Sequence, residues 1–165
     1  MAELTNLESK LAEVLGLASA AKGAAEKVRG MLDEDERDLA DRLEQMKDEA
    51  SETERRCTEV AAQFDGKKTA IVEEGRQTKQ EVTEMMQTYL AGESDALDGF
   101  EFLTMAEAGE VGHWAILKKL NERAGIVAVG ELAEWALPIQ ERHLSGVLSG
   151  STEIAGREDP NAAAD

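Results

Sequence analysis

The chain has 165 residues, enough for one domain of ordinary size, and its formal net charge is −17. This acidic balance argues against direct binding to nucleic-acid phosphates or to anionic lipid surfaces. With 4% aromatic residues, two prolines and one cysteine, the composition favours a helical protein and excludes a disulfide framework within the chain. Neither a transmembrane run nor a signal-peptide pattern is visible, so we expect a cytoplasmic protein without nucleic-acid or membrane partners.

Two apolar heptad seams predict long helices in the first part of the chain. The first helix is expected over 7–32, and Thr5 and Glu8 have the spacing of a capping box at its start. The second is expected over 36–64, and Cys57 on its seam is expected to be a small buried apolar residue. In both seams the apolar residues recur at alternating steps of four and three residues, which is the heptad pattern.

The third and fourth helices are separated by a polar break. The third is expected over 67–91 and has the weakest apolar seam of the chain. Ser94 or Asp95 can cap the fourth helix, which is expected over 95–123 with Gly125 as its stop. The third helix is therefore the best candidate for a connection between two helical hairpins.

The fifth helix is expected over 127–149, with Gly150 as its end. Pro138 lies inside this helix and removes one backbone donor, so we expect a kink there. Residues 151–165 are small and polar, and the sequence predicts that they form a flexible tail that could dock to a protein partner.

Short connections between helices of this length place sequential helices antiparallel. The sequence therefore predicts one all-α domain over 1–150. We expect an antiparallel four-helix bundle made of two hairpins, with an additional crossover helix between them, five helices in all.

The two histidines suggest where chemistry could occur. They form the patterns Glu110-x-x-His113 and Gln140-x-x-His143, and residues three apart share one face of a helix. A carboxylate and an imidazole placed in this way can ligate one metal ion, although an ordinary solvated helix face gives the same pattern. The candidate metal ligands are Glu107, Glu110, His113, Glu141 and His143.

Gly109 and Gly112 flank this motif in the middle of the fourth helix. Glycine destabilises a helix interior by about 0.5–1 kcal/mol relative to alanine. Its presence is explained if another backbone or a bound group approaches closely, or if two helices pack closely there.

The segments DALDGFEFLTMAEAGEVGHWAILKKLNERAG (95–125) and ELAEWALPIQERHLSGVL (131–148) resemble the ferritin-like superfamily, most closely its YciF-type branch and related actinobacterial ferritin-like proteins. The resemblance implies two hairpins packed with a crossover around a di-iron or di-manganese centre of glutamates and E-x-x-H motifs. On the matching positions, Glu110 corresponds to the single glutamate of the third bundle helix, and His143 corresponds to the histidine of the fourth.

The sequence departs from that family pattern in two places. The first hairpin has no histidine, and Gln140 stands where an E-x-x-H motif has glutamate. Two outcomes follow. Either the site has degenerated and the fold serves assembly, or a symmetric dimer gathers Glu110, His113 and His143 from both chains around a shared metal pair.

Two classes of function remain open at this point. The first is a ferritin-like protein of stress or metal handling that binds iron or manganese, since carboxylates suit hard ions. The alternative is a non-catalytic oligomerisation or scaffold protein with a degenerate metal site. For both we expect a homodimer or higher homo-oligomer, and whether the protein is an enzyme stays open.

Overall fold

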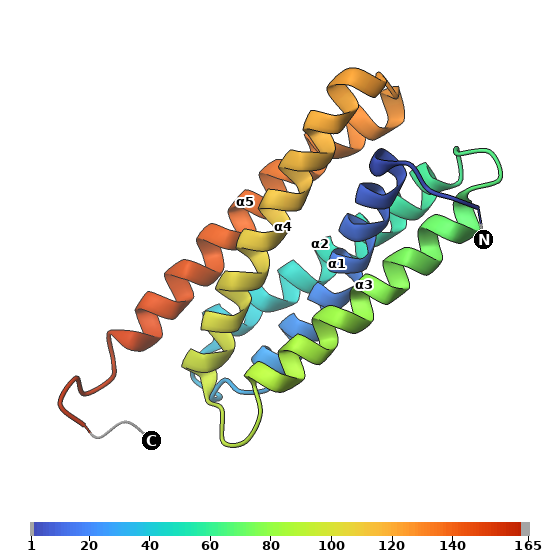
Figure 1. Cartoon of the computed structure of the whole chain (residues 1–165). Coiled ribbons are helices and arrows are strands. Elements are labelled where there is room, and N and C mark those ends of the chain that lie inside the picture. The colour runs from blue at the N-terminus through green and yellow to red at the C-terminus, as the bar shows by residue number, and fades with distance from the viewer. Residues whose placement is uncertain (1, 163–165) are drawn as a thin grey trace.

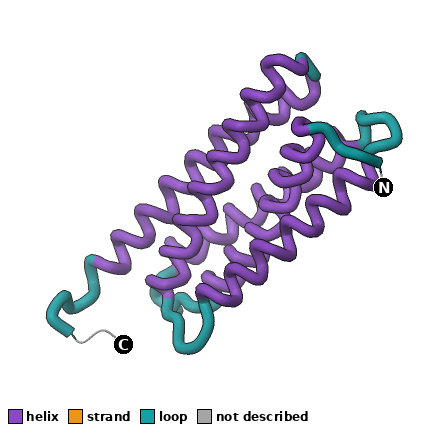
Figure 2. Tube along the Cα trace, in the orientation of Figure 1, coloured by secondary structure: helices purple, strands orange, loops and turns teal. Residues whose placement is uncertain are grey.

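The computed structural model describes residues 2–162, and over these residues the protein is all-α (Figures 1 and 2). No strand occurs in that range, which confirms the predicted fold class of five helices. Within it, no helix is both long enough and apolar enough to cross a membrane. The helices are α1 (Asn6–Arg29), α2 (Arg37–Ala61), α3 (Lys68–Tyr89), α4 (Ala96–Ala124) and α5 (Val127–Ala155).

Four of the helices close a bundle and the fifth lies outside it. Helix α1 packs against α2 and α4, and α5 packs against the same two helices, so α1, α2, α5 and α4 form a ring. Helix α3 lies along α1 and returns the chain to the end where α2 began, so α4 runs in the direction of α2 (Figure 1). The third helix thus connects two antiparallel hairpins, as the sequence predicts.

Side-chain caps fix where two helices begin. Thr5 and Glu8 form the predicted capping box, with hydrogen bonds of 2.7 Å and 3.3 Å between each side chain and the other residue's backbone N–H. Asp95 and Asp98 form a second box before α4, with two bonds of 3.0 Å. Gly125 ends α4 in the left-handed conformation at φ 68°, which glycine adopts without strain.

The last helix ends later than the sequence predicts. Helix α5 continues to Ala155, so the start of the expected tail is helical, while 163–165 lie outside the described residues. Gly150 is buried inside this helix because the Phe100 ring packs on it: a Cβ there would lie 2.6 Å from Cδ1 of that ring. Ile154 is also buried, and its packing extends the helix beyond the glycine.

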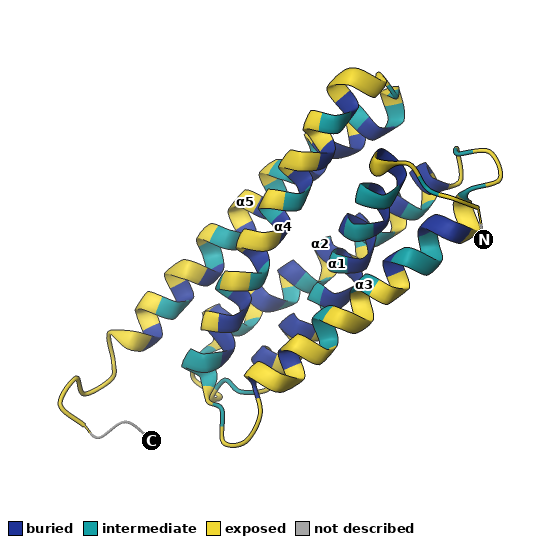
Figure 3. Cartoon of the chain, viewed as in Figure 1, coloured by how far each residue is buried: buried dark blue, intermediate teal, exposed yellow. Residues whose placement is uncertain are grey.

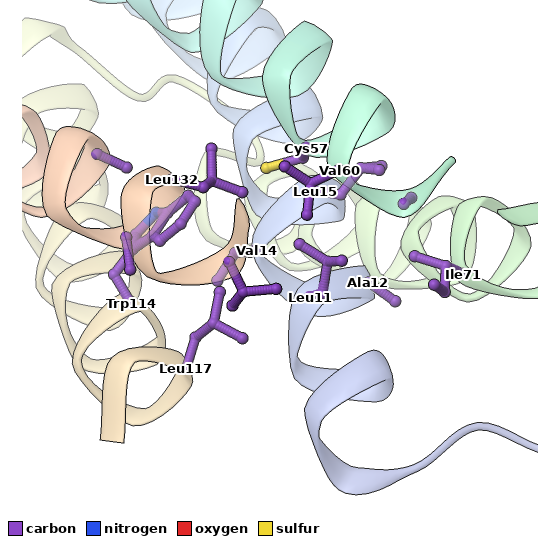
Figure 4. Close-up of a cluster of buried hydrophobic side chains, with 14 of the residues drawn as sticks. Leu11, Ala12, Val14, Leu15, Cys57, Val60, Ile71, Trp114, Leu117 and Leu132 are labelled. Carbon is purple, nitrogen blue, oxygen red and sulfur yellow. The ribbon is translucent and has the colours of Figure 1, made fainter. Parts of the chain in front are cut away.

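The apolar core has two clusters, one near each end of the bundle. Figure 4 shows the first, in which Leu11, Cys57 and Trp114 come from three different helices. The second gathers around Phe100 and Leu103. Buried positions face inward on α1, α2, α4 and α5, whereas much of α3 is exposed (Figure 3).

Candidate functional site

A polar centre lies between the two apolar clusters. Along α4, Glu107 and Glu110 fall between the two clusters, and Gln140 and His143 do so along α5. All four side chains are buried, with at most 5% of their surface exposed. Each pair is three residues apart on its helix, which places both members on one face. These four residues, together with Glu49 of α2, are called the polar centre below.

His143 lies between two carboxylates from two other helices. Its Nε2 is 2.6 Å from Oε2 of Glu49, and its Nδ1 is 3.6 Å from Oε2 of Glu107. The other oxygen of Glu49 accepts hydrogen bonds from Arg142 at 2.6 Å and from Gln45 at 3.0 Å. The imidazole therefore joins α2 to α4 through α5.

This geometry favours a charged imidazole. Burial lowers the pKa of His143, but the nearby carboxylate of Glu107 and the hydrogen bond and negative charge of Glu49 outweigh it, so the pKa is raised above its usual value. Burial raises the pKa of Glu49, yet the hydrogen bonds from Gln45, His143 and Arg142 bring it below the ordinary value. An imidazolium bound to an ionised Glu49 is the favoured state.

Glu110 is the buried carboxyl group of the centre whose pKa is raised. Burial, and then the negative charge of Glu107, raise the pKa of Glu110 well above its usual value, although Gln140 donates a hydrogen bond to its carboxylate and opposes the shift. Burial, and then the charges of Glu110 and Glu54, also raise the pKa of the Cys57 thiol. A fully buried thiol of raised pKa is unreactive, which agrees with the expected structural role of Cys57.

One buried oxygen in the centre lacks a hydrogen bond. Oε2 of Glu107 is inaccessible and has no hydrogen-bond partner among the described residues. The nearest basic atom, Nδ1 of His143 at 3.6 Å, is within ion-pair range but too far for a hydrogen bond. This oxygen is the one unsatisfied position of the polar centre.

The structure separates the five candidate ligands into two groups. Glu107, Glu110 and His143 meet in the polar centre, but His113 and Glu141 do not. His113 faces α1, where its Nδ1 lies 2.8 Å from Glu13 and 3.3 Å from Lys10. Glu141 is exposed on α5.

Helix geometry explains why His113 lies on a different face of α4 from Glu107. Three residues fall short of one 3.6-residue turn by about 60°, so a line of three-residue steps winds around the helix. His113 is two such steps from Glu107, about 120° around α4, and so reaches the face that α1 covers. Glu141 follows Gln140 by one residue, which turns it about 100° away from the buried face of α5.

The residues present do not fit a di-metal centre within one chain. Among residues 2–162, no three His, Cys, Asp or Glu side chains come close enough together to hold a metal ion. Gln140 donates to Glu110 where the family pattern would supply a further carboxylate. His143 lies between two carboxylates that favour its protonated form, whereas a metal ligand must be a neutral imidazole.

The polar centre contains one residue that the sequence did not single out. Glu49 follows Met46 of the apolar seam by three residues and precedes Ala50 of the same seam by one. This flanking position lets its carboxylate reach the bundle interior. The helix has many acidic residues, so sequence alone offers no signal that selects Glu49 among them.

Comparison of the chain with protein-family models, with curated proteins and with solved structures gives no significant match. The ferritin-like relationship remains a prediction from sequence.

Proposed function

We propose that this protein is a non-catalytic helical scaffold of ferritin-like architecture, and that its polar centre is structural. The arrangement of the helices supports the ferritin-like part of the proposal. Two antiparallel hairpins, α1–α2 and α4–α5, are joined by α3, which runs the length of the bundle. This is the arrangement that the resemblance of 95–125 and 131–148 implies.

One observation carries the structural role: the polar centre uses its own side chains to satisfy its charges. Gln140 is bonded to Glu110, and His143 is bonded to Glu49. A buried charge is tolerated when it is paired, and a buried carboxyl group without such a pair keeps its proton. The polar centre contains both a paired charge and a carboxyl group of raised pKa. It therefore holds α2, α4 and α5 in register without a bound metal ion.

Metal analysis tests this proposal. The protein is expressed with added iron, manganese and zinc salts, dialysed, and measured for metal per chain. We expect far less than one metal ion per chain and a melting temperature that a chelator does not change, because Glu110 and His143 are already paired with Gln140 and Glu49. Stoichiometric metal that is retained by Glu141→Gln but lost in Glu107→Gln would contradict the proposal.

The same outcome would support a second candidate function, a metal-binding ferritin-like protein of stress or metal handling. The observation in its favour is the buried Oε2 of Glu107, which has no hydrogen-bond partner among the described residues. Glu107, Glu110 and a neutral His143 would have to move closer together to hold the ion, and their oxygen-rich set suits iron or manganese. Pairing of two chains, with Glu110, His113 and His143 from each, remains the alternative way to complete such a site.

A further inference from the structure

A groove runs between α1, α3 and α4. Helices α3 and α4 both pack on α1, but no extensive contact joins them to each other among the described residues. The resulting cavity has a volume of about 770 Å³, with α1 as its floor and the other two helices as its walls. Figure 1 shows α3 and α4 as the two ribbons on either side of α1. This cavity is called the groove below.

The chemistry of the groove changes from one end to the other. Helices α1 and α3 run in the same direction, and α4 runs antiparallel to them. The polar lining residues of the three helices therefore lie at one end of the groove, and most of the apolar ones lie at the other. Lys10, Glu13, Glu74 and His113 line one end. The other end is apolar and is lined by Ala21, Ala24, Val82, Met85, Phe102 and Met105.

Large apolar side chains are exposed at the apolar end. Met85 is 65% exposed and Met105 is 53% exposed, on opposite walls of the groove. Beyond the groove, Tyr89 is 43% exposed, and its ring centroid lies 5.7 Å from that of Phe102, which lines the groove. Exposed apolar side chains gathered in one groove indicate a binding surface, and methionine adapts its shape to a partner.

Gly109 supports a close approach from outside the chain. It is exposed, lines the groove and lies in the middle of α4, where glycine is less favourable than alanine. A Cβ added there would meet nothing within 4 Å, so packing between helices does not require glycine. A bound segment that passes close to the backbone of α4 would require it.

The charge of the groove indicates the character of the bound segment. Its solvent-accessible carboxylates are Glu13, Glu74 and Glu81, and its basic side chains, Lys10 and His113, both contact Glu13. Glu107 and Glu110 also line the groove but are buried in the polar centre. A second copy of this chain carries a further net charge of −17 and so offers no basic complement to these carboxylates. A basic segment complements the groove.

We infer that the groove binds a basic amphipathic helix of a partner protein. The apolar face of that helix covers Met85 and Met105, and its lysine or arginine side chains meet Glu13, Glu74 and Glu81. From Lys10 to Ala24 the floor is about 20 Å long, which matches three to four turns of helix. This inference rests on the proposed scaffold function and names the class of partner that the scaffold holds.

A model peptide tests the inference. The probe is a labelled peptide of about 18 leucine and lysine residues, with the leucines spaced to form one apolar helix face. Binding to the full chain is measured by fluorescence anisotropy. We expect saturable one-to-one binding, and no binding by a peptide of the same pattern with glutamate in place of lysine.

A matched pair of variants separates docking in the groove from general attraction between charges. Met105→Glu and Ile116→Glu both place an acidic residue at an exposed apolar position of α4, but only Met105 lines the groove. We expect Met105→Glu to weaken binding by about 10-fold or more, because it removes an apolar contact and buries a charge. Ile116→Glu should leave the affinity within about twofold, since exposed charges contribute little.

A second pair tests the approach at Gly109. Gly109→Ala and Gly112→Ala both replace an exposed glycine of α4 that has open space around it, and only the first lines the groove. Both should raise the melting temperature, whereas only Gly109→Ala should weaken peptide binding, by about threefold or more.

Several results would overturn the inference. They are equal loss of affinity in Met105→Glu and Ile116→Glu, equal affinity of the two alanine variants, no binding of the lysine peptide, or dimerisation of the chain that the peptide does not disrupt. None of these results changes the metal content of the protein, so failure here is distinguishable from failure of the proposed function.

Discussion

At the scale of single residues, buried ionisable side chains hold the centre of the bundle through paired charges. The carboxylates of Glu107 and Glu49 raise the pKa of His143 against the effect of burial, and burial, together with the charge of Glu107, raises the pKa of Glu110. The sequence singled out Glu107 and Glu110 because residues three apart share a helix face, and it singled out His143 through the Gln140-x-x-His143 pattern and the family resemblance. The sequence could not separate His113 from them. That separation depends on how a line of three-residue steps winds around α4, and on which neighbouring helix covers each of its faces.

Glu110→Gln should stabilise the protein near neutral pH. Because the pKa of Glu110 is raised in the folded state, its contribution is complete below about pH 4.5 and is lost as the pH rises through the raised value. Glutamine has no proton to lose. We expect the melting temperature of the variant to exceed that of the wild type by about 2–4 °C at about pH 8, and the difference to shrink towards about pH 4.5. Glu141→Gln, which is exposed, is the control and should show no such trend.

His143→Ala should destabilise the protein by about 3 kcal/mol, because it leaves the buried Glu107 without a cation and removes one of the partners of the half-buried Glu49. The raised pKa of His143 gives a contribution that is complete below about pH 6.5 and is lost as the pH rises through the folded value. Urea denaturation at several pH values measures the loss. A loss that does not fall between about pH 6 and about pH 9 would contradict the charged imidazole.

At the scale of helices, the position of α3 is set by two glycines. Gly16 of α1 and Gly75 of α3 lie at the crossing of these helices, where a Cβ on Gly75 would be 2.9 Å from the carbonyl oxygen of Ala12. The sequence predicted the helices, the capping box of Thr5 and Glu8, and a cap at Ser94 or Asp95 from local patterns. It did not predict this crossing or the extension of α5 past Gly150, because both depend on which backbone or ring lies opposite a glycine.

Gly16→Ala should destabilise the protein by about 1–3 kcal/mol, because the added methyl group would overlap the backbone of Gly75 and lie 2.7 Å from Cβ of Thr78. Gly23→Ala on the same helix is the matched control, since nothing lies within 4 Å of its Cβ position. That variant should be more stable than the wild type by about 0.5–1 kcal/mol. Chemical denaturation of both proteins compares them, and equal effects would argue against close packing of α1 on α3.

At the scale of the whole molecule, a strongly acidic surface surrounds a bundle whose two hairpins are joined by an external helix. The sequence predicted this architecture because the heptad seams, caps and short breaks all indicate long antiparallel helices. It gave no indication of the groove, which arises because α3 packs on α1 and leaves α4 uncovered on that side. The segment that could dock to a protein partner is shorter than the predicted tail of residues 151–165, because Ile154 is buried in the bundle.

The charge of the molecule predicts a response to salt. With a net charge of −17, repulsion between acidic side chains opposes the compact state. Raising the ionic strength from about 0.01 M to about 0.5 M shortens the Debye length and should raise the melting temperature. Sodium chloride and potassium chloride should act alike. A melting temperature that falls with both salts would mean that surface ion pairs outweigh the repulsion.

The central claim is that a protonated His143, bound to carboxylates, holds the centre of the bundle together. The protonation state of its imidazole tests this claim most directly. In a His113→Gln variant His143 is the single histidine, so its ring nitrogens can be followed by NMR without ambiguity. We predict that both nitrogens carry protons at about pH 7, and that one equivalent of Zn²⁺ leaves their signals unchanged. A neutral ring whose signals shift to an end point at one equivalent of Zn²⁺ would contradict the account and identify a metal centre.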